Sequence, residues 1–178
     1  MKKYAIISLG CSRNLVDSEV ISGLLHEHGF ASGDVAQGVD LCVVNTCAFI
    51  SSAREESVDT IMEIAALKKS GKVRKLVVCG CLPQLYKNKL FKALPEADLV
   101  LGTGDFPKLA LFLRNMKAGG RAADISPTPQ YLYDETSPRR LLTPRHYAYV
   151  KVSEGCDNLC TYCIISRLRG SFRSRPIE

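Results

Sequence analysis

Three cysteines near the carboxyl end of the chain have the spacing to bind one metal centre. Cys156, Cys160 and Cys163 form a C-x3-C-x2-C pattern. Three thiolates on a cubane 4Fe–4S cluster leave one iron open for a substrate or cofactor, whereas a fourth cysteine closes the clusters of electron carriers. A zinc site usually takes a fourth Cys or His, and His146 is the only histidine nearby in the sequence. The pattern therefore favours an iron–sulfur cluster with an open iron over a zinc site.

A second set of three cysteines stands at matching places earlier in the chain. Cys11, Cys47 and Cys81 each follow a predicted strand. The carboxyl ends of parallel strands meet at one edge of a sheet, so these thiolates could bind a second cluster with an open iron. The alternative is that they are small core residues, because free cysteine is often buried. Three matching positions favour ligands, whereas Cys42 and Cys79 lie inside predicted strands and are interpreted as core residues.

The elements that must position these cysteines alternate between strands and helices. Short apolar runs predict strands over 4–9, 41–44, 76–78 and 98–101. Apolar periodicity and terminal signals predict helices over 17–28, 51–69, 83–94 and 107–116. In the helix over 51–69 the predicted apolar face is Val58, Ile61, Met62 and Ala65, and Asp17 or Ser18 is the predicted cap of the first helix. The alternation predicts an α/β fold, an open parallel sheet with helices on both faces.

The rest of the chain changes character after about residue 117. Residues 118–146 contain two adjacent glycines and four prolines and show little periodicity, which predicts a linker. Residues 147–152 then predict a strand that delivers Cys156 at its end. We therefore expect one domain over 1–117, a linker over 118–146, and the truncated start of a second domain over 147–178. This last part is too short to build a core, so we expect it to be mobile or packed on the first domain or a neighbouring chain.

Composition limits the remaining choices. The 178 residues are 46% hydrophobic, with a net charge of +6 and eight cysteines, and no apolar run is long enough to span a membrane. The apolar start lacks a cleavage pattern and is interpreted as a strand, not a signal peptide. We expect a cytoplasmic protein whose cysteines serve metal or redox chemistry rather than disulfides. Four arginines between Arg167 and Arg175 are either a footprint for RNA or anionic groups or a solvated loop.

Taken together, these motifs resemble a known enzyme family. The Cys156–Cys160–Cys163 pattern looks like the radical S-adenosylmethionine motif. The turns Ser8-Leu9-Gly10-Cys11, Asn45-Thr46-Cys47 and Gly80-Cys81 look like those of the methylthiotransferase amino-terminal domain. Residues 14–19, 102–106 and 143–149 look more like the RimO branch, which modifies a ribosomal protein, than like the branch that modifies tRNA. Ser166 departs from the family, which usually has Pro there, and the chain is much shorter than the family pattern.

The resemblance implies a function and a set of roles. Cys156, Cys160 and Cys163 would hold one 4Fe–4S cluster at the start of a partial β/α barrel, and its open iron would bind S-adenosyl-L-methionine to generate a radical. Cys11, Cys47 and Cys81 would hold the second 4Fe–4S cluster, which carries the sulfur. Tyr162 would pack on the adenine, although a core contact is the alternative. The implied reaction is methylthiolation of the β-carbon of an aspartate in protein twelve of the small ribosomal subunit, near the decoding centre.

The resemblance also implies partners and leaves alternatives. The partners are the small-subunit ribosomal protein, a reductant protein such as flavodoxin or ferredoxin, and a contact to ribosomal RNA, with no membrane involved. Without the rest of the barrel, this chain alone is expected to be inactive. The alternatives are a tRNA-adenosine methylthiotransferase of the same family, a two-cluster electron-transfer module, and a zinc-dependent RNA-binding module.

Overall fold

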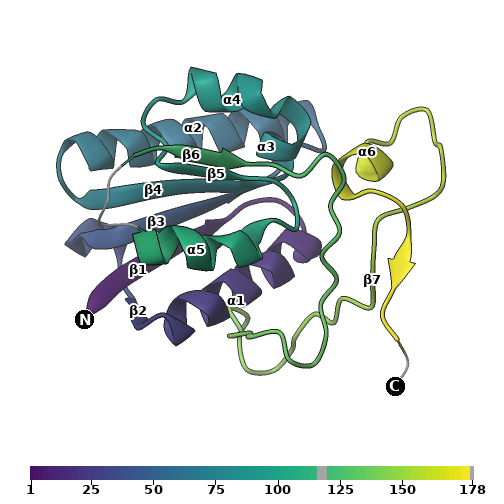
Figure 1. Cartoon of the computed structure of the whole chain (residues 1–178), viewed down its shortest axis with the longest axis horizontal. Helices are drawn as coiled ribbons and strands as arrows, with labels where there is room; N and C mark the ends of the chain where they lie inside the picture. The colour runs from purple at the N-terminus through teal and green to yellow at the C-terminus, as the bar shows by residue number, and fades with distance from the viewer. Residues whose placement is uncertain (116–119, 177–178) are drawn as a thin grey trace.

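The computed structural model describes residues 1–115 and 120–176, and its centre is a parallel sheet (Figure 1). Six strands lie in the order β2-β1-β3-β4-β5-β6, and every neighbouring pair is parallel. The strands are β1 (Lys2–Ser8), β2 (Phe30–Ser32), β3 (Val39–Thr46), β4 (Val73–Gly80), β5 (Leu99–Leu101) and β6 (Ala122–Asp124). The predicted open parallel α/β sheet is confirmed.

Helices cover both faces of the sheet because both faces of the central strands are apolar. In β3, Cys42 and Val44 belong to one apolar cluster, and Leu41 and Val43 belong to the other. The first cluster is closed by α2 (Ser51–Lys69), α3 (Cys81–Tyr86) and α4 (Asn88–Ala93), and the second by α1 (Ser12–Glu27), the 3-10 turn η2 (Phe106–Lys108) and α5 (Leu109–Asn115). A further 3-10 turn, η1 (Val35–Gln37), precedes β3. Figure 1 shows α2 and α4 on one side of the sheet and α1 and α5 on the other.

Two helix predictions need correction. In α2 the buried face consists of Ser57, Ile61, Ile64 and Ala65, whereas Val58 and Met62 are 42% and 49% exposed. The predicted helix over 83–94 is two helices, because Lys87 between them has a φ of 48°, a left-handed conformation that no α-helix continues through. The predicted end of the last helix at Met116 lies outside the described residues.

The segment predicted as a linker contributes to the sheet. Within it, Ala122–Asp124 forms β6, which pairs in parallel with β5. Further along, the chain crosses α1 in backbone contact, since a Cβ on Gly23 would lie 2.6 Å from the Pro138 carbonyl oxygen. The side chain of Arg139 then pairs with buried Glu19 of α1 at 2.6 Å. These contacts hold the segment against the first domain.

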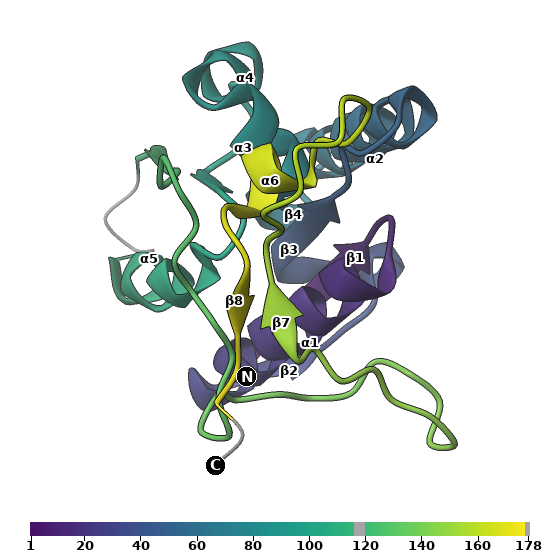
Figure 2. The same ribbon diagram turned by 90° about the vertical axis from the view of Figure 1, so that its right-hand side faces the viewer.

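The carboxyl-terminal part of the chain is packed on the same domain (Figure 2). It contains β7 (Ser153–Glu154), α6 (Ile165–Arg169) and β8 (Arg173–Ser174), with β7 and β8 paired antiparallel. Residues 147–152, all of them described, form no strand, so the predicted strand there is wrong. Leu168 of α6 lies in the apolar cluster on the α2 face of the sheet. Of the outcomes expected for this part, packing on the first domain is therefore the one observed; the division into domains stays a prediction.

Candidate metal centres

The first three candidate ligands gather at the carboxyl edge of the sheet. The strands β1, β3 and β4 are direct neighbours, with Ser8 opposite Asn45 and Thr46 opposite Gly80. Cys11, Cys47 and Cys81 follow these strands and therefore lie at one edge, as predicted. The chain leaves β1 toward β2 and leaves β3 toward β4, so the strand order reverses here. Such a reversal is where open α/β sheets place their ligand sites.

The turn after β1 lies directly against the turn after β3. A Cβ on Gly10 would lie 2.6 Å from Cys47 Cβ and 2.7 Å from Cys47 Sγ, and Gly10 has a φ of 85°. Only glycine tolerates both the contact and the conformation. Cys47 is buried, and its backbone is fixed by Ser57, whose hydroxyl accepts from Cys47 N at 3.0 Å and can donate to Cys47 O at 2.9 Å. Cys81 is also buried, whereas Cys11 is exposed.

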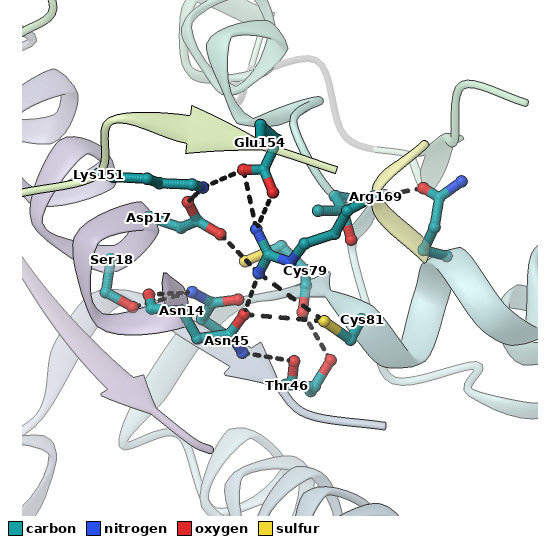
Figure 3. A network of polar contacts seen from close by, with 12 residues as sticks. Asn14, Asp17, Ser18, Asn45, Thr46, Cys79, Cys81, Lys151, Glu154 and Arg169 are labelled. Atoms are coloured by element: carbon teal, nitrogen blue, oxygen red, sulfur yellow. Dashed lines mark hydrogen bonds and ion pairs between the residues drawn. The ribbon is translucent and has the colours of Figure 1, made fainter. Parts of the chain in front are cut away.

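Two asparagines tie the turns after β1 and β3 to each other and to α1 (Figure 3). The amide of Asn14 in α1 donates to Leu9 O at 3.0 Å and to Thr46 O at 2.8 Å. The amide of Asn45 donates to Asn14 O and to the Ser18 hydroxyl, both at 2.9 Å. Both side chains are fully buried, so each bond holds its turn in a place that water does not reach. Asn45 therefore braces the loop that carries Cys47.

Thr46 fixes the third turn. Its hydroxyl donates to Cys79 O at 2.7 Å and accepts from Leu82 N at 3.2 Å, which ties β3 to the start of α3. A Cβ on Gly80 would lie 2.3 Å from the Asn45 side-chain oxygen. The backbone before Cys81 is thus as tightly constrained as the backbone before Cys11.

A buried arginine reaches this edge from the carboxyl-terminal part. Arg169 is only 1% exposed. Its Nη2 lies 2.7 Å from Asn14 Oδ1, 3.0 Å from Asp17 Oδ2 and 3.9 Å from Cys81 Sγ, and its Nη1 lies 3.1 Å from a carboxylate oxygen of Glu154 (Figure 3). Asp17 is therefore an ion-pair partner inside α1. The prediction that Asp17 or Ser18 caps this helix is wrong, because Cys11 occupies the N-cap position, without a side-chain cap bond.

A lysine completes the ion-pair cluster. Lys151 Nζ lies 2.7 Å from Asp17 Oδ1 and also pairs with Glu154. Burial alone would raise the pKa of Asp17, but Lys151 and Arg169 outweigh it and lower that pKa. Burial raises the pKa of the Cys81 thiol, and the positive charge of Arg169 partly offsets this. The sequence does not predict this cluster, because Arg169 stands among three other arginines of one short basic stretch.

The second set of cysteines lies in one loop between β7 and α6. Cys156 and Cys163 are half-buried and Cys160 is exposed. Cys163 N donates to Cys160 O at 3.1 Å, and the Asn158 amide lies 3.5 Å from Cys156 Sγ. Tyr162 is 86% exposed and makes no core contact within the described residues. The ligand roles of both sets, and the adenine contact of Tyr162, stay predictions.

Both candidate sets consist of thiols, the donors that iron–sulfur clusters bind through. Within residues 1–115 and 120–176, no three His, Cys, Asp or Glu side chains are grouped so that they could hold one metal ion. A cubane cluster binds each thiolate through a different iron, and it needs more widely spaced sulfurs than one ion does. The two sets of three thiols come from adjacent strand ends and from a single loop.

Cys42 and Cys79 differ from both sets of candidate ligands in their surroundings. Both are buried in strands, Cys42 in the cluster on the α2 face and Cys79 in the cluster on the α1 face. Burial raises the pKa of Cys42 to about 12 and raises that of Cys79 as well. Their surroundings agree with the interpretation of both as core residues.

The fold is that of an α/β protein, with three cysteines gathered at the carboxyl edge of its parallel sheet, where the strand order reverses. Comparison with known proteins gives its family. Residues 3–102 match the model of the uncharacterized protein family UPF0004. The match spans more than half of the chain, so the chain belongs to this family. No helix in the described ranges has both the length and the apolar character needed to cross a membrane.

Curated relatives match almost the whole chain. A protein of Trichlorobacter lovleyi is 48% identical over 99% of this chain, and one of Syntrophotalea carbinolica is 50% identical over 99%. One of Heliobacterium modesticaldum is 48% identical, also over 99%. Each is called ribosomal protein uS12 methylthiotransferase RimO. The chain spans 39%, 39% and 38% of their respective lengths.

Proposed function

We propose that this chain carries the two cluster sites of a radical S-adenosylmethionine methylthiotransferase acting on ribosomal protein uS12. The placement of Cys11, Cys47 and Cys81 at one edge of the sheet supports this most directly, because that arrangement suits three ligands of one cluster. The C-x3-C-x2-C loop supports the second site, and the names of the relatives support the substrate. The proposed acceptor is the β-carbon of an aspartate, and the proposed location is the cytoplasm.

Each part of the chain would have a distinct role in this reaction. A cluster on Cys156, Cys160 and Cys163 would supply the electron that cleaves S-adenosyl-L-methionine and so allows hydrogen abstraction from an unactivated carbon. The exposed ring of Tyr162 would pack against the adenine of that molecule. The braced edge with Cys11, Cys47 and Cys81 would hold the second cluster in a fixed position beside the loop.

Iron binding tests the two sites separately. After anaerobic reconstitution with iron and sulfide, the unaltered chain should hold about eight iron atoms, four per cluster. Replacing Cys11, Cys47 and Cys81 together with Ala should leave about four, and so should replacing the other three. A chain that takes up zinc rather than iron, or triple variants that keep the full iron content, would contradict the proposal.

The choice between an enzyme and an electron-transfer module rests on the open iron. S-adenosyl-L-methionine should change the electron paramagnetic resonance spectrum of the reduced chain only when Cys156, Cys160 and Cys163 are present. No change would favour an electron-transfer module. The substrate should be tested with a protein of the relatives' length, a reductant such as flavodoxin, and either uS12 or tRNA. Methylthiolation of tRNA in place of uS12 would favour the tRNA-modifying alternative.

A further inference from the structure

One side chain physically joins the two candidate cluster sites. Arg169 belongs to α6, which begins two residues after Cys163. Its guanidinium ends 3.9 Å from Cys81 Sγ on the other site. Arg169 is therefore attached to the helix that follows one set of cysteines and touches a member of the other set.

The contacts of Arg169 fix the guanidinium at both ends. Nη1 is held by both carboxylate oxygens of Glu154, and Nη2 by Asp17 and Asn14. Asn14 is itself the residue that ties the turns before Cys11 and Cys47. The arginine is thus bound to the brace of the first site, and its position cannot change without disturbing that brace.

The charges around Arg169 balance one another, and its Nη2 also faces Cys81. Asp17 and Glu154 supply two carboxylates, and Lys151 and Arg169 supply two cations, all of them buried. A thiolate at Cys81, bound to iron, would add negative charge beside Nη2. In a buried environment an anion beside a fixed cation is much more stable than an isolated one.

We propose that Arg169 is a positioning residue that docks the C-x3-C-x2-C segment onto the sheet and raises the reduction potential of the cluster on Cys11, Cys47 and Cys81. The inference rests on the proposed function. Reduction adds negative charge to a cluster, and a fixed positive charge beside one of its sulfurs stabilises the reduced state.

The sign of the potential shift separates this role from a merely structural one. Loss of the positive charge disfavours the reduced cluster and lowers its potential. Loss of packing alone admits water, which stabilises added charge and raises the potential. Leu168→Ala provides the packing control, because Leu168 is a buried, uncharged neighbour of Arg169 in α6.

The test uses the 178-residue chain with Cys156, Cys160 and Cys163 replaced by Ala, so that only the first cluster is measured. In that background, Arg169→Met should give a more negative midpoint potential in a redox titration followed by electron paramagnetic resonance. Arg169→Lys keeps the charge and should recover part of the shift. Arg167→Met, the same substitution at an exposed position of α6, should change nothing.

Docking is measured without iron. In the metal-free chain, Arg169→Met should increase hydrogen exchange over residues 153–174, and Arg167→Met should not. Arg169→Met leaves the carboxylates of Asp17 and Glu154 with Lys151 as their one buried cation. If this variant does not fold, the double variant Arg169→Met with Glu154→Gln restores the charge balance and is used instead.

The outcomes distinguish the two levels of the proposal. An unchanged or raised potential in Arg169→Met overturns the electrostatic role, and unchanged hydrogen exchange overturns the docking role. If the parent chain binds no cluster, the proposed function fails and the electrostatic role fails with it, whereas the exchange experiment still decides the docking role.

Discussion

The side-chain amide of Asn45 donates a hydrogen bond to the backbone carbonyl of Asn14, across 31 positions of sequence. A second hydrogen bond runs from α1 to β3: the Asn14 amide donates to the carbonyl of Thr46, the neighbour of Asn45. The end of β3 and the start of α1 are therefore held by two buried bonds of opposite direction. Removing either amide removes one of these two buried bonds.

Asn45→Ala is expected to loosen the site before it unfolds the protein. We expect a loss of about 1–3 kcal/mol of stability, because two buried hydrogen bonds are lost, and a lower iron content in the Cys11, Cys47 and Cys81 set. Chemical denaturation and iron analysis measure the two effects. Asn88→Ala, at an exposed position, is the control, and equal iron content in Asn45→Ala and the unaltered chain would contradict the bracing role.

Gly10→Ala should displace Cys47. The added Cβ would collide with Cys47 Cβ and Sγ, and alanine would also be strained at a φ of 85°. Gly29→Ala is a matched control, since Gly29 has a φ of 78° and nothing within 4 Å of its Cβ position. We expect the control to lose only the conformational cost, about 1–2 kcal/mol, and to keep its iron. A Gly10→Ala chain with normal iron content would show that the close contact does not position Cys47.

Cys42→Ala and Cys79→Ala are expected to leave the iron content unchanged. Both side chains are fully buried in strands, so their loss should cost only stability, roughly 1 kcal/mol each through a small cavity. Iron analysis after reconstitution, beside Cys47→Ala and Cys81→Ala as positive controls, measures this. Loss of about four irons in either strand variant would make that residue a ligand.

Asp98 should make stability depend on pH in the acid range. Burial disfavours its charge, but Lys68, the Leu76 amide and Lys75 outweigh burial and hold the pKa of Asp98 below 3.8. Because the folded pKa is lowered, the stability that Asp98 contributes is present above about pH 4 and is lost as the pH falls through the folded pKa.

Asp98→Asn tests this dependence. At pH 7 the variant should be less stable by about 1–3 kcal/mol, because it loses charge-assisted hydrogen bonds, and the difference should narrow below pH 4. Denaturant titrations at several pH values measure it. Asp59→Asn, at an exposed position of α2, is the control; a difference that stays constant down to pH 2 would refute the assignment.

The parts of the fold that sequence predicts well are those with continuous apolar runs. The central strands β3 and β4 are apolar on both faces, and their positions follow from that pattern alone. The strand ends then place Cys11, Cys47 and Cys81 at one edge without further information. By contrast, β2 and β6 are only three residues long, too short to carry a periodic signal.

The remaining differences come from tertiary contacts. Val58 and Met62 extend a periodic apolar face but point away from the core, whereas Ser57 is buried because it bonds to Cys47. Arg169 looks like its exposed neighbour Arg167 in sequence. Its burial is favourable because the carboxylates of Asp17 and Glu154 pair with it. No local sequence pattern predicts these contacts.

The sixth strand has a practical consequence for shortened versions of the protein. A chain ended near residue 117 would lack β6 and expose the backbone of β5, whose residues Leu99, Val100 and Leu101 are all apolar. A bare, apolar sheet edge pairs readily with other chains and promotes aggregation. The short strand Ala122–Asp124 thus acts as a protective cover, and any soluble version of the amino-terminal domain should extend at least through Asp124.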